Sequence, residues 1–327
     1  MKWLITGGCG FIGTSLIKNL LEEGGHQIRV IDNLTVGTFK DLSKVCDYHL
    51  PGNSNVFSDV EVVVNSITGY GNVLKAAEGS DVIVHLAAMS GVRESVEKPK
   101  VWFENNVIGT HNVLEAAREC GVGTVVMASS GACVGDTEPP ITETILPEPI
   151  SPYGATKICG EMLGHAYYHA YGMNTVSLRF SNVYGPLSTH KTSLVAKFIK
   201  YAFENKSFPI YGDGKQTRDF IYTEDLMEGI KAAVTADESG VFQLCTGVET
   251  SVNEVIKFLR DRLRNFGFSP QTFNMEEQVG DLKTNWADNS KAKEILDWEP
   301  KVKLGDGLSN TIDWFMEERR KKIDDPE

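Results

Sequence analysis

The first 130 residues alternate short apolar runs with stretches whose apolar positions recur at helical spacing. The runs predict four strands, at residues 3–5, 28–32, 81–86 and 124–128. The stretches between them predict helices over 11–23, 71–78 and 105–120. These strands lack the polar alternation of a sheet with one face in water, so we expect a parallel sheet covered on both faces. The pattern is typical of a doubly wound α/β domain.

The pattern changes after about residue 185, where glycine- and aspartate-containing loops separate shorter elements. Helical spacing there predicts helices over about 192–204, 224–235, 252–266 and 307–321. We therefore divide the chain into a larger doubly wound domain, residues 1–185, and a smaller mixed α/β substrate domain, residues 186–327, whose elements can interleave. The charge-dense tail at 317–327 is interpreted as a solvated helix end rather than a binding arm.

A glycine-rich turn joins the first strand to the first helix, with Gly7, Gly10 and Gly13 in a G-x-x-G-x-x-G pattern. The first glycine permits a tight turn, the second leaves room for a pyrophosphate, and the third lets the helix pack closely on the sheet. The helix start adds free N–H groups and a partial positive charge. Because the pattern lies between a strand and a helix, it predicts the dinucleotide site of a Rossmann-type fold, not a plain turn.

Asp32 stands at the end of the second predicted strand. A carboxylate at this position can accept hydrogen bonds from both ribose hydroxyls of an adenosine, and it repels a 2′-phosphate. The expected cofactor is therefore NAD rather than NADP. The alternative is that Asp32 is an ordinary turn residue at a strand end.

A second constellation combines Tyr153, Lys157 and Ser130. Tyr153 and Lys157 are spaced i, i+4 at the start of a predicted helix, which places them on one face. The Lys157 ammonium is expected to lower the pKa of the phenol, so that Tyr153 becomes a general acid and base near neutral pH. Ser130 ends a strand whose carboxyl end faces the ligand crevice, where its hydroxyl can bond the same substrate oxygen. The alternative for the tyrosine–lysine pair alone is a surface pair.

Composition narrows the range of partners. The 327 residues carry a formal net charge of −12, which disfavours nucleic acid and anionic membranes but admits a small anionic ligand in a locally positive pocket. The six cysteines are scattered and contain no C-x-x-C pair, so we expect no metal site and a reducing compartment. Neither a signal peptide nor a membrane-spanning run is recognised, and we predict a cytoplasmic location.

These motifs resemble those of the extended short-chain dehydrogenases/reductases of the NAD-dependent epimerase/dehydratase family. Within it, the chain is most similar to nucleotide-sugar 4-epimerases of the UDP-glucose 4-epimerase type. The resemblance extends over nearly the whole chain. Besides the motifs above, it rests on the segments 30–34, 85–88, 106–110, 179–186, 211–219, 280–281 and 286–288.

The resemblance implies two sets of site residues. For the cofactor it implies Gly7, Gly10, Phe11, Ile12, Gly13, Asp32, Asn33, Leu86, Ala87, Ala88, Asn106, Ser129, Tyr153 and Lys157. For a UDP-sugar substrate it implies Ser130, Asn182, Tyr211, Arg218, Asp281 and Asn285. Tyr211 is expected beside the base and Arg218 at the ribose or diphosphate, which a guanidinium suits by its bidentate geometry. The alternative for Arg218 is an ion pair with Asp213 or Asp219.

Three positions depart from the family pattern. Ser66 stands where an aspartate usually contacts adenine, and the segment 133–135 lacks the usual tyrosine before its glycine. Gln278 replaces a second arginine that usually binds the diphosphate. We therefore expect changed adenine and diphosphate contacts, with Lys191 or Arg93 as a substitute cation.

The resemblance to an epimerase implies a transient 4-keto sugar. Tyr153 takes the proton of the sugar O4 hydroxyl, a hydride passes from C4 to NAD and returns to the other face, and Ser130 orients O4. Family dehydratases and decarboxylases carry extra acid–base residues directly after the catalytic serine, whereas Gly131, Ala132 and Cys133 follow here. A dehydratase, a keto-sugar reductase and a non-catalytic NAD-binding scaffold stay as alternatives, although the retained tyrosine–lysine pair disfavours the scaffold.

Asn285 bears on the sugar. In the family, a tyrosine at this position restricts the pocket to non-acetylated hexoses and a smaller residue admits an N-acetyl group. We therefore expect UDP-GlcNAc/UDP-GalNAc in preference to UDP-Glc/UDP-Gal, with hexuronic acids as an alternative if Arg93 pairs with a carboxylate. Family members commonly dimerise through two helices, here 92–118 and 152–170, so a homodimer is the predicted assembly.

Overall fold

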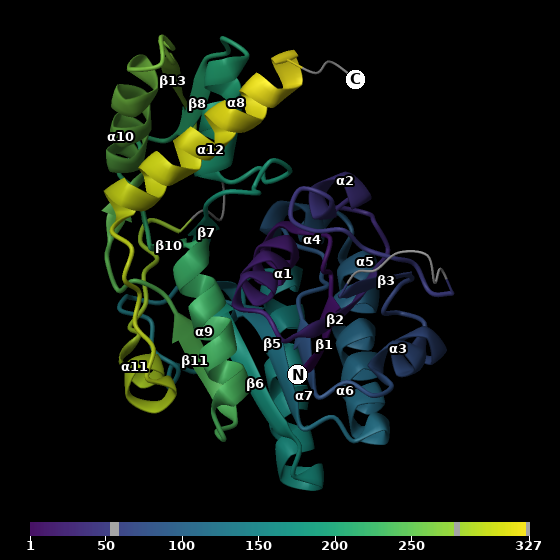
Figure 1. Ribbon diagram of the computed structural model, residues 1–327. Helices are drawn as coiled ribbons and strands as arrows, with labels where there is room; N and C mark the ends of the chain where they lie inside the picture. The colour runs from purple at the N-terminus through teal and green to yellow at the C-terminus, as the bar shows by residue number, and fades with distance from the viewer. Residues whose placement is uncertain (53–58, 278–281, 325–327) are drawn as a thin grey trace.

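The computed structural model describes residues 1–52, 59–277 and 282–324. Figure 1 shows a larger lobe built around a sheet and a smaller lobe above it. Asp281 and Gln278, which the sequence analysis names, lie outside the described residues. No helix in the described ranges is both long and apolar enough to cross a membrane.

Seven parallel strands form the central sheet, in the order β11-β6-β5-β4-β1-β2-β3. In chain order they are β1 (Lys2–Thr6), β2 (Gln27–Asp32), β3 (Val60–Val64), β4 (Val82–His85), β5 (Thr124–Ser130), β6 (Asn174–Phe180) and β11 (Gly240–Leu244). This arrangement confirms the predicted doubly wound α/β fold. The strand order reverses between β1 and β4, so a ligand crevice is expected at the carboxyl ends of these two strands.

Helices cover both faces of the sheet because successive strand residues point to opposite sides. Trp3 and Ile5 of β1 pack on one side and Leu4 on the other. One face carries α1 (Phe11–Glu23) and α9 (Thr223–Thr235), and the other carries α3 (Tyr70–Ala77), α6 (Gly109–Cys120) and α7 (Pro152–Tyr171). Smaller elements on this lobe are α2 (Phe39–Leu42), α4 (Val92–Glu97), α5 (Pro99–Phe103), the 3-10 turn η2 (Gly131–Cys133) and α11 (Ser290–Leu296).

The smaller lobe has its own apolar core. It is built from α8 (Leu194–Phe203), α10 (Val252–Arg264) and α12 (Leu304–Asp324), which pack on β8 (Phe208–Tyr211) and β13 (Thr272–Met275). Two short strand pairs lie between the lobes, β7 (Asn182–Tyr184) with β10 (Phe220–Tyr222) and β9 (Thr217–Arg218) with β12 (Thr250–Ser251). Because α9 and β11 return to the large sheet, the two predicted domains interleave, and the boundary at residue 185 stays a prediction.

The apolar pattern does not predict every element of the sheet lobe. Strand β6 was missed because Ser177 and Arg179 interrupt its apolar residues, yet both are buried. The helix predicted over 105–120 is also more irregular than its pattern suggests. It begins in a π-helical turn, η1 (Glu104–Ile108), that joins α5 to α6. Such turns are often found at functional sites.

Candidate active site

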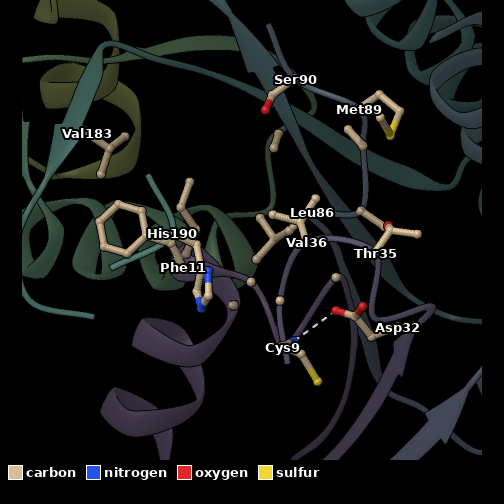
Figure 2. Close-up of a pocket in the computed structure, with 18 of the residues that line it drawn as sticks. Cys9, Phe11, Asp32, Thr35, Val36, Leu86, Met89, Ser90, Val183 and His190 are labelled. Atoms are coloured by element: carbon tan, nitrogen blue, oxygen red, sulfur yellow. Dashed lines mark hydrogen bonds between the residues drawn. The ribbon is translucent and has the colours of Figure 1, made fainter. Parts of the chain in front are cut away.

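A cavity of about 360 Å³ opens at the carboxyl ends of β1 and β4, where the strand order reverses. Segments that are far apart along the chain supply its walls. The predicted residues that line it are Gly7, Gly10, Phe11, Ile12, Gly13, Asp32, Asn33, Leu86, Ala87, Ala88, Ser129, Ser130, Tyr153, Lys157 and Asn182. Figure 2 shows Phe11 on one side of this cavity and Asp32 on the other.

The glycine-rich turn has the close backbone contacts that a dinucleotide site requires. Gly7 has a φ of +71°, and a Cβ there would lie 2.8 Å from the Ala87 backbone nitrogen. A Cβ at Gly13 would lie 2.5 Å from the Gly7 carbonyl oxygen. The helix that follows is capped by Gly10 without a side-chain hydrogen bond, so its first N–H groups are available to a phosphate. The turn therefore fits the pyrophosphate of a dinucleotide.

Asp32 is fixed at the end of β2 by the turn itself. Its Oδ2 accepts a hydrogen bond from the Cys9 backbone at 2.9 Å, drawn in Figure 2, and its Oδ1 accepts one from Leu34 at 2.8 Å. Burial raises the pKa of this carboxyl, and the two backbone hydrogen bonds act in the opposite direction. Each oxygen keeps a lone pair for a ribose hydroxyl, so the geometry fits the role predicted for Asp32.

Helix α7 carries Tyr153 and Lys157 into the cavity. The helix begins at Pro152, and the Ser151 hydroxyl accepts a hydrogen bond from the Gly154 N–H at 3.1 Å. Lys157 Nζ donates to the Ala128 carbonyl of β5 at 2.7 Å. Ser130, at the end of the same strand, lies near enough to the Tyr153 phenol to lower its pKa. The three residues predicted to carry the chemistry therefore lie together.

The pKa of Tyr153 shifts in the opposite direction to the sequence prediction, in which Lys157 lowers it. Burial raises the pKa of this phenol, and Ser130 offsets only part of the rise. The lysine is itself desolvated, which lowers its pKa to about 8, and its ammonium bonds the Ala128 carbonyl. Burial, and not Lys157, therefore sets the direction in which the pKa of Tyr153 shifts.

A second cavity, of about 190 Å³, adjoins the first and shares Asn182, Val183 and Ser193 with it. Arg218 lines it and donates to the Thr217 carbonyl at 2.7 Å and the Leu282 carbonyl at 2.8 Å. Tyr211 adjoins this cavity through Gln216, whose amide donates to the Tyr211 carbonyl at 2.9 Å.

The two carboxylates weighed as partners of Arg218 have other bonds. Asp213 pairs with Lys215 at 3.0 Å. Asp219 is buried and accepts hydrogen bonds from Ser181, Thr246 and Gly247. Asn285 lies beside Arg218, because its backbone N–H donates to the Thr217 carbonyl at 3.2 Å and its carbonyl accepts from the Asp219 N–H at 3.1 Å. Its Oδ1 is 3.8 Å from the place where a Cβ on Gly131 would be. It is thus beside the turn that follows Ser130.

A family model described as the NAD dependent epimerase/dehydratase family matches residues 3–245. The chain belongs to this family. The family's dependence on NAD confirms the cofactor predicted from Asp32.

Relatives in this family differ in their sugars. A UDP-glucuronate 4-epimerase of Thermodesulfobacterium geofontis is 34% identical over 317 residues, 96% of each chain. The structure of a Thermotoga maritima UDP-glucose 4-epimerase with UDP-glucose gives a TM-score of 0.88 at 31% identity, over 98% of this chain and 100% of that one. A Methanobrevibacter ruminantium UDP-N-acetylglucosamine 4-epimerase, in complex with UDP-N-acetylmuramic acid, gives 0.87 at 27% identity, over 97% and 98%.

In this member of the epimerase/dehydratase family, Asn106 lies behind the cavity wall. Its side chain accepts a hydrogen bond from the Met89 N–H at 2.7 Å and donates to the Met89 carbonyl and the Thr156 hydroxyl, both at 3.0 Å. Met89 lines the cavity, and Thr156 lies between Tyr153 and Lys157 on α7. Asn106 therefore ties the wall to the catalytic helix, and its contacts are with protein groups.

Ser129 lines the cavity, but its hydroxyl is also used by a protein group. Its hydroxyl donates to Glu161 at 2.5 Å. The Ser66 hydroxyl bonds Thr68 at 2.8 Å, while its neighbours Asn65 and Ile67 line the cavity. Sequence reasoning aligned the segment around Ser66 with the adenine contact, and its neighbours Asn65 and Ile67 do line the cavity. It did not place the loop at 187–193 on the cofactor cavity, because only tertiary packing brings that loop there.

His85 is a buried group that the motifs do not point to. Its Nδ1 lies 2.7 Å from the Thr6 hydroxyl and its Nε2 lies 3.0 Å from the Thr110 hydroxyl. Thr110 donates its own proton to the Asn106 carbonyl at 2.5 Å, so it must accept from His85, which fixes the Nε2–H tautomer. Thr6 in turn accepts from the Ala87 N–H at 3.1 Å. The neutral ring of His85 thus connects β1 with α6.

The stability of the protein should depend on pH through His85. Burial lowers the pKa of this imidazole to about 3, while the unfolded chain takes up a proton near its ordinary value of 6.5. Below pH 6.5 the unfolded state therefore binds more protons, and stability falls by about 1.4 kcal/mol per pH unit from this group. Urea unfolding between pH 7.5 and 5 should show a steeper loss for the wild type than for His85→Gln. The exposed His169→Gln should keep the wild-type slope.

Proposed function

We propose that this protein is an NAD-dependent 4-epimerase of a UDP-sugar. The observation that carries the proposal is that Tyr153, Lys157 and Ser130 share one cavity with the glycine-rich turn and Asp32. An acid–base group beside a dinucleotide site is the arrangement that reversible oxidation of an alcohol requires. The relatives described above are named as 4-epimerases of UDP-sugars, which supports the reaction and the carrier.

In this proposal, the residues of the chain move a proton and orient the sugar. Ser130 and Tyr153 bind the C4 hydroxyl, and Tyr153 accepts its proton as C4 is oxidised to a ketone. When bound, NAD supplies the hydride acceptor and a positive ring that favours the phenolate. Lys157, whose ammonium reaches the cavity beside the Ala128 carbonyl, binds the nicotinamide ribose. Tyr153 returns the proton to O4 when C4 is reduced on its other face.

The turn after Ser130 disfavours a dehydratase. Elimination needs a further acid or base near the sugar, and η2 supplies Gly131, Ala132 and Cys133 at this place. Burial raises the pKa of the Cys133 thiol to about 11, and its sulfur lies 3.4 Å from the Ser129 hydroxyl. None of these three side chains can exchange a proton with substrate near neutral pH.

We infer that the second cavity takes the UDP part of the substrate. It joins the cofactor cavity at Asn182 and contains Arg218, whose guanidinium suits a diphosphate. From there the sugar reaches the Ser130 turn, where Asn285 lies. Asp281 is also proposed for this part of the site on the resemblance alone.

We further propose an N-acetylated sugar. A side chain of the size of Asn285 beside Gly131 leaves more room than a tyrosine, and its amide can bond an acetamido group. Arg93, the group weighed as a carboxylate partner, is 81% exposed and pairs with Glu97 at 3.4 Å. That arrangement gives no support for a hexuronic acid.

A substrate panel tests both parts of this proposal. Purified protein without added NAD would be incubated with UDP-GlcNAc, UDP-Glc and UDP-GlcA, and proton NMR would follow the C4 epimer. We expect UDP-GlcNAc to turn over fastest, and Asn285→Tyr to lower its kcat/KM by about tenfold relative to UDP-Glc. The exposed Asn265→Tyr is the matched control. A 4-keto product would contradict the reaction, and faster turnover of another sugar would contradict the specificity.

The predicted homodimer has a candidate surface. Exposed apolar side chains lie along α5, η1 and α7, which pack together on one side of the sheet lobe. They are Val101, Phe103, Ile108, Met162 and Tyr168. We infer that a second copy of the chain covers this face, which light scattering of the purified protein would test by mass. The cytoplasmic location stays a prediction of the sequence.

A further inference from the structure

The loop at 185–193, between β7 and α8, reaches across to the cofactor cavity of the sheet lobe. Leu187, His190, Lys191 and Ser193 line the same cavity as the glycine-rich turn. The loop is held in shape from behind by Lys200 of α8, whose Nζ donates to the Thr189 carbonyl at 2.9 Å and the Lys191 carbonyl at 2.8 Å. It therefore presents a defined surface to the cofactor.

His190 fastens this loop to the sheet lobe. Its Nε2 lies 2.9 Å from the carboxylate of Asp41. Asp41 is held in a capping box with Thr38 at the start of α2 and also pairs with Lys44 at 3.3 Å. In Figure 2, His190 and Phe11 lie on the same side of the cavity, across from Asp32. The loop thus meets the cavity at the start of α1.

Lys191 brings a cation to that position. Its Nζ lies 5.8 Å from the centre of the Phe11 ring, and Phe11 is the first residue of α1. The side chain is half-buried, and burial lowers the pKa of its ammonium. Within the described ranges no carboxylate pairs with it. Removing water from an ammonium without supplying a counter-ion costs free energy. An anionic ligand in the cavity would offset that cost.

We propose that Lys191 pairs with the pyrophosphate of bound NAD and that the 185–193 loop thereby retains the cofactor. The glycine-rich turn offers backbone N–H groups to the diphosphate, and Lys191 faces it from the smaller lobe. The diphosphate of a UDP-sugar has the same chemistry, but Arg218 already marks the neighbouring cavity for it. The position of Lys191 over Phe11 favours the dinucleotide. This inference rests on the family's cofactor and is independent of which sugar is epimerised.

Release of NAD tests the proposal without any substrate. Protein loaded with NAD would be mixed with excess ethanol and alcohol dehydrogenase, which convert released NAD into NADH and reveal it by absorbance. Lys191→Gln should release NAD about tenfold faster than wild type, since a charge-assisted contact is lost. Lys191→Arg should stay near the wild-type rate. Added salt should accelerate release from the wild type more than from Lys191→Gln.

Three comparisons make the outcome decisive. Lys206→Gln removes the same charge from an exposed site on the smaller lobe and should leave the rate unchanged. His190→Gln should accelerate release to a smaller extent, because it loosens the loop and leaves the cation. UDP affinity of the NAD-loaded Lys191→Gln protein should match the wild type. If Lys191→Gln releases NAD at the wild-type rate, the proposal is wrong. If the variant also binds UDP more weakly than the wild type, the lysine instead binds the diphosphate of the substrate.

Discussion

Replacing Tyr153 with phenylalanine should reduce epimerisation by about three orders of magnitude while leaving NAD bound. The hydroxyl is the one group that we propose to exchange a proton with the sugar, and it shares the cavity with Ser130. Phenylalanine keeps the ring, so the packing at the start of α7 is retained. Turnover would be followed by proton NMR at saturating substrate, and bound NAD would be measured on the same sample.

A tyrosine elsewhere on the same helix provides the control for this experiment. Tyr168 is 43% exposed, and Tyr168→Phe should have wild-type turnover. If Tyr153→Phe retained turnover within about tenfold of the wild type, the phenol would not be the proton acceptor. The proposed assignment of Tyr153 would then be wrong, even if the protein proved to be an epimerase.

Replacing Glu161 with alanine should destabilise the protein by about 3–5 kcal/mol. Glu161 and Arg179 are both 2% exposed, and their bidentate pair has N–O distances of 2.8 and 2.7 Å. Removing the carboxylate leaves a buried guanidinium without its counter-ion, since arginine does not lose its proton. It also removes the acceptor of the Ser129 hydroxyl. Urea unfolding of NAD-saturated protein would measure the loss.

An exposed ion pair shows how far this effect depends on burial. Lys18 and Glu22 lie 2.9 Å apart on α1 with both side chains more than half exposed, and Glu22→Ala should cost at most about 1 kcal/mol. Replacing both Glu161 and Arg179 with methionine should recover part of the stability, because no uncompensated charge is left. A Glu161→Ala loss as small as that of Glu22→Ala would contradict this interpretation.

The sequence predicts those parts of the site whose geometry is set by residues close to one another along the chain. The glycine-rich turn, Asp32 and the tyrosine–lysine pair are recognisable because a strand end, a tight turn or one helical face places their groups. Their roles toward NAD and sugar stay predictions, but the structure places most of these residues in one cavity. The same local reasoning predicted β1, β2, β4 and β5 together with α1, α3 and α6, but not β3.

Features that arise from tertiary packing were not predictable in this way. Strand β6 was not recognised because Arg179 interrupts its apolar pattern. The carboxylate that allows this arginine to be buried, Glu161, lies on another element, α7. The pKa of Tyr153 was predicted to be lowered by Lys157, whereas burial raises it, since spacing says nothing about burial or about the Ala128 carbonyl that binds the lysine. Asn106 matches a family segment, yet only the fold shows that its amide is used by Met89 and Thr156.

The π-helical turn η1 places a constraint on how this chain can change in length. A π-helical turn contains one residue more than an α-helical turn, so removing one residue from 104–108 would close it to an α-helical turn and change the direction of Asn106 relative to the residues before it. Asn106 could then no longer reach Met89 and Thr156 while Phe103 kept its outward position. Substitutions along this helix can be absorbed one at a time. A single-residue deletion would instead separate the wall of the cofactor cavity from the catalytic helix, so descendants of this chain should vary here in side chains and not in length.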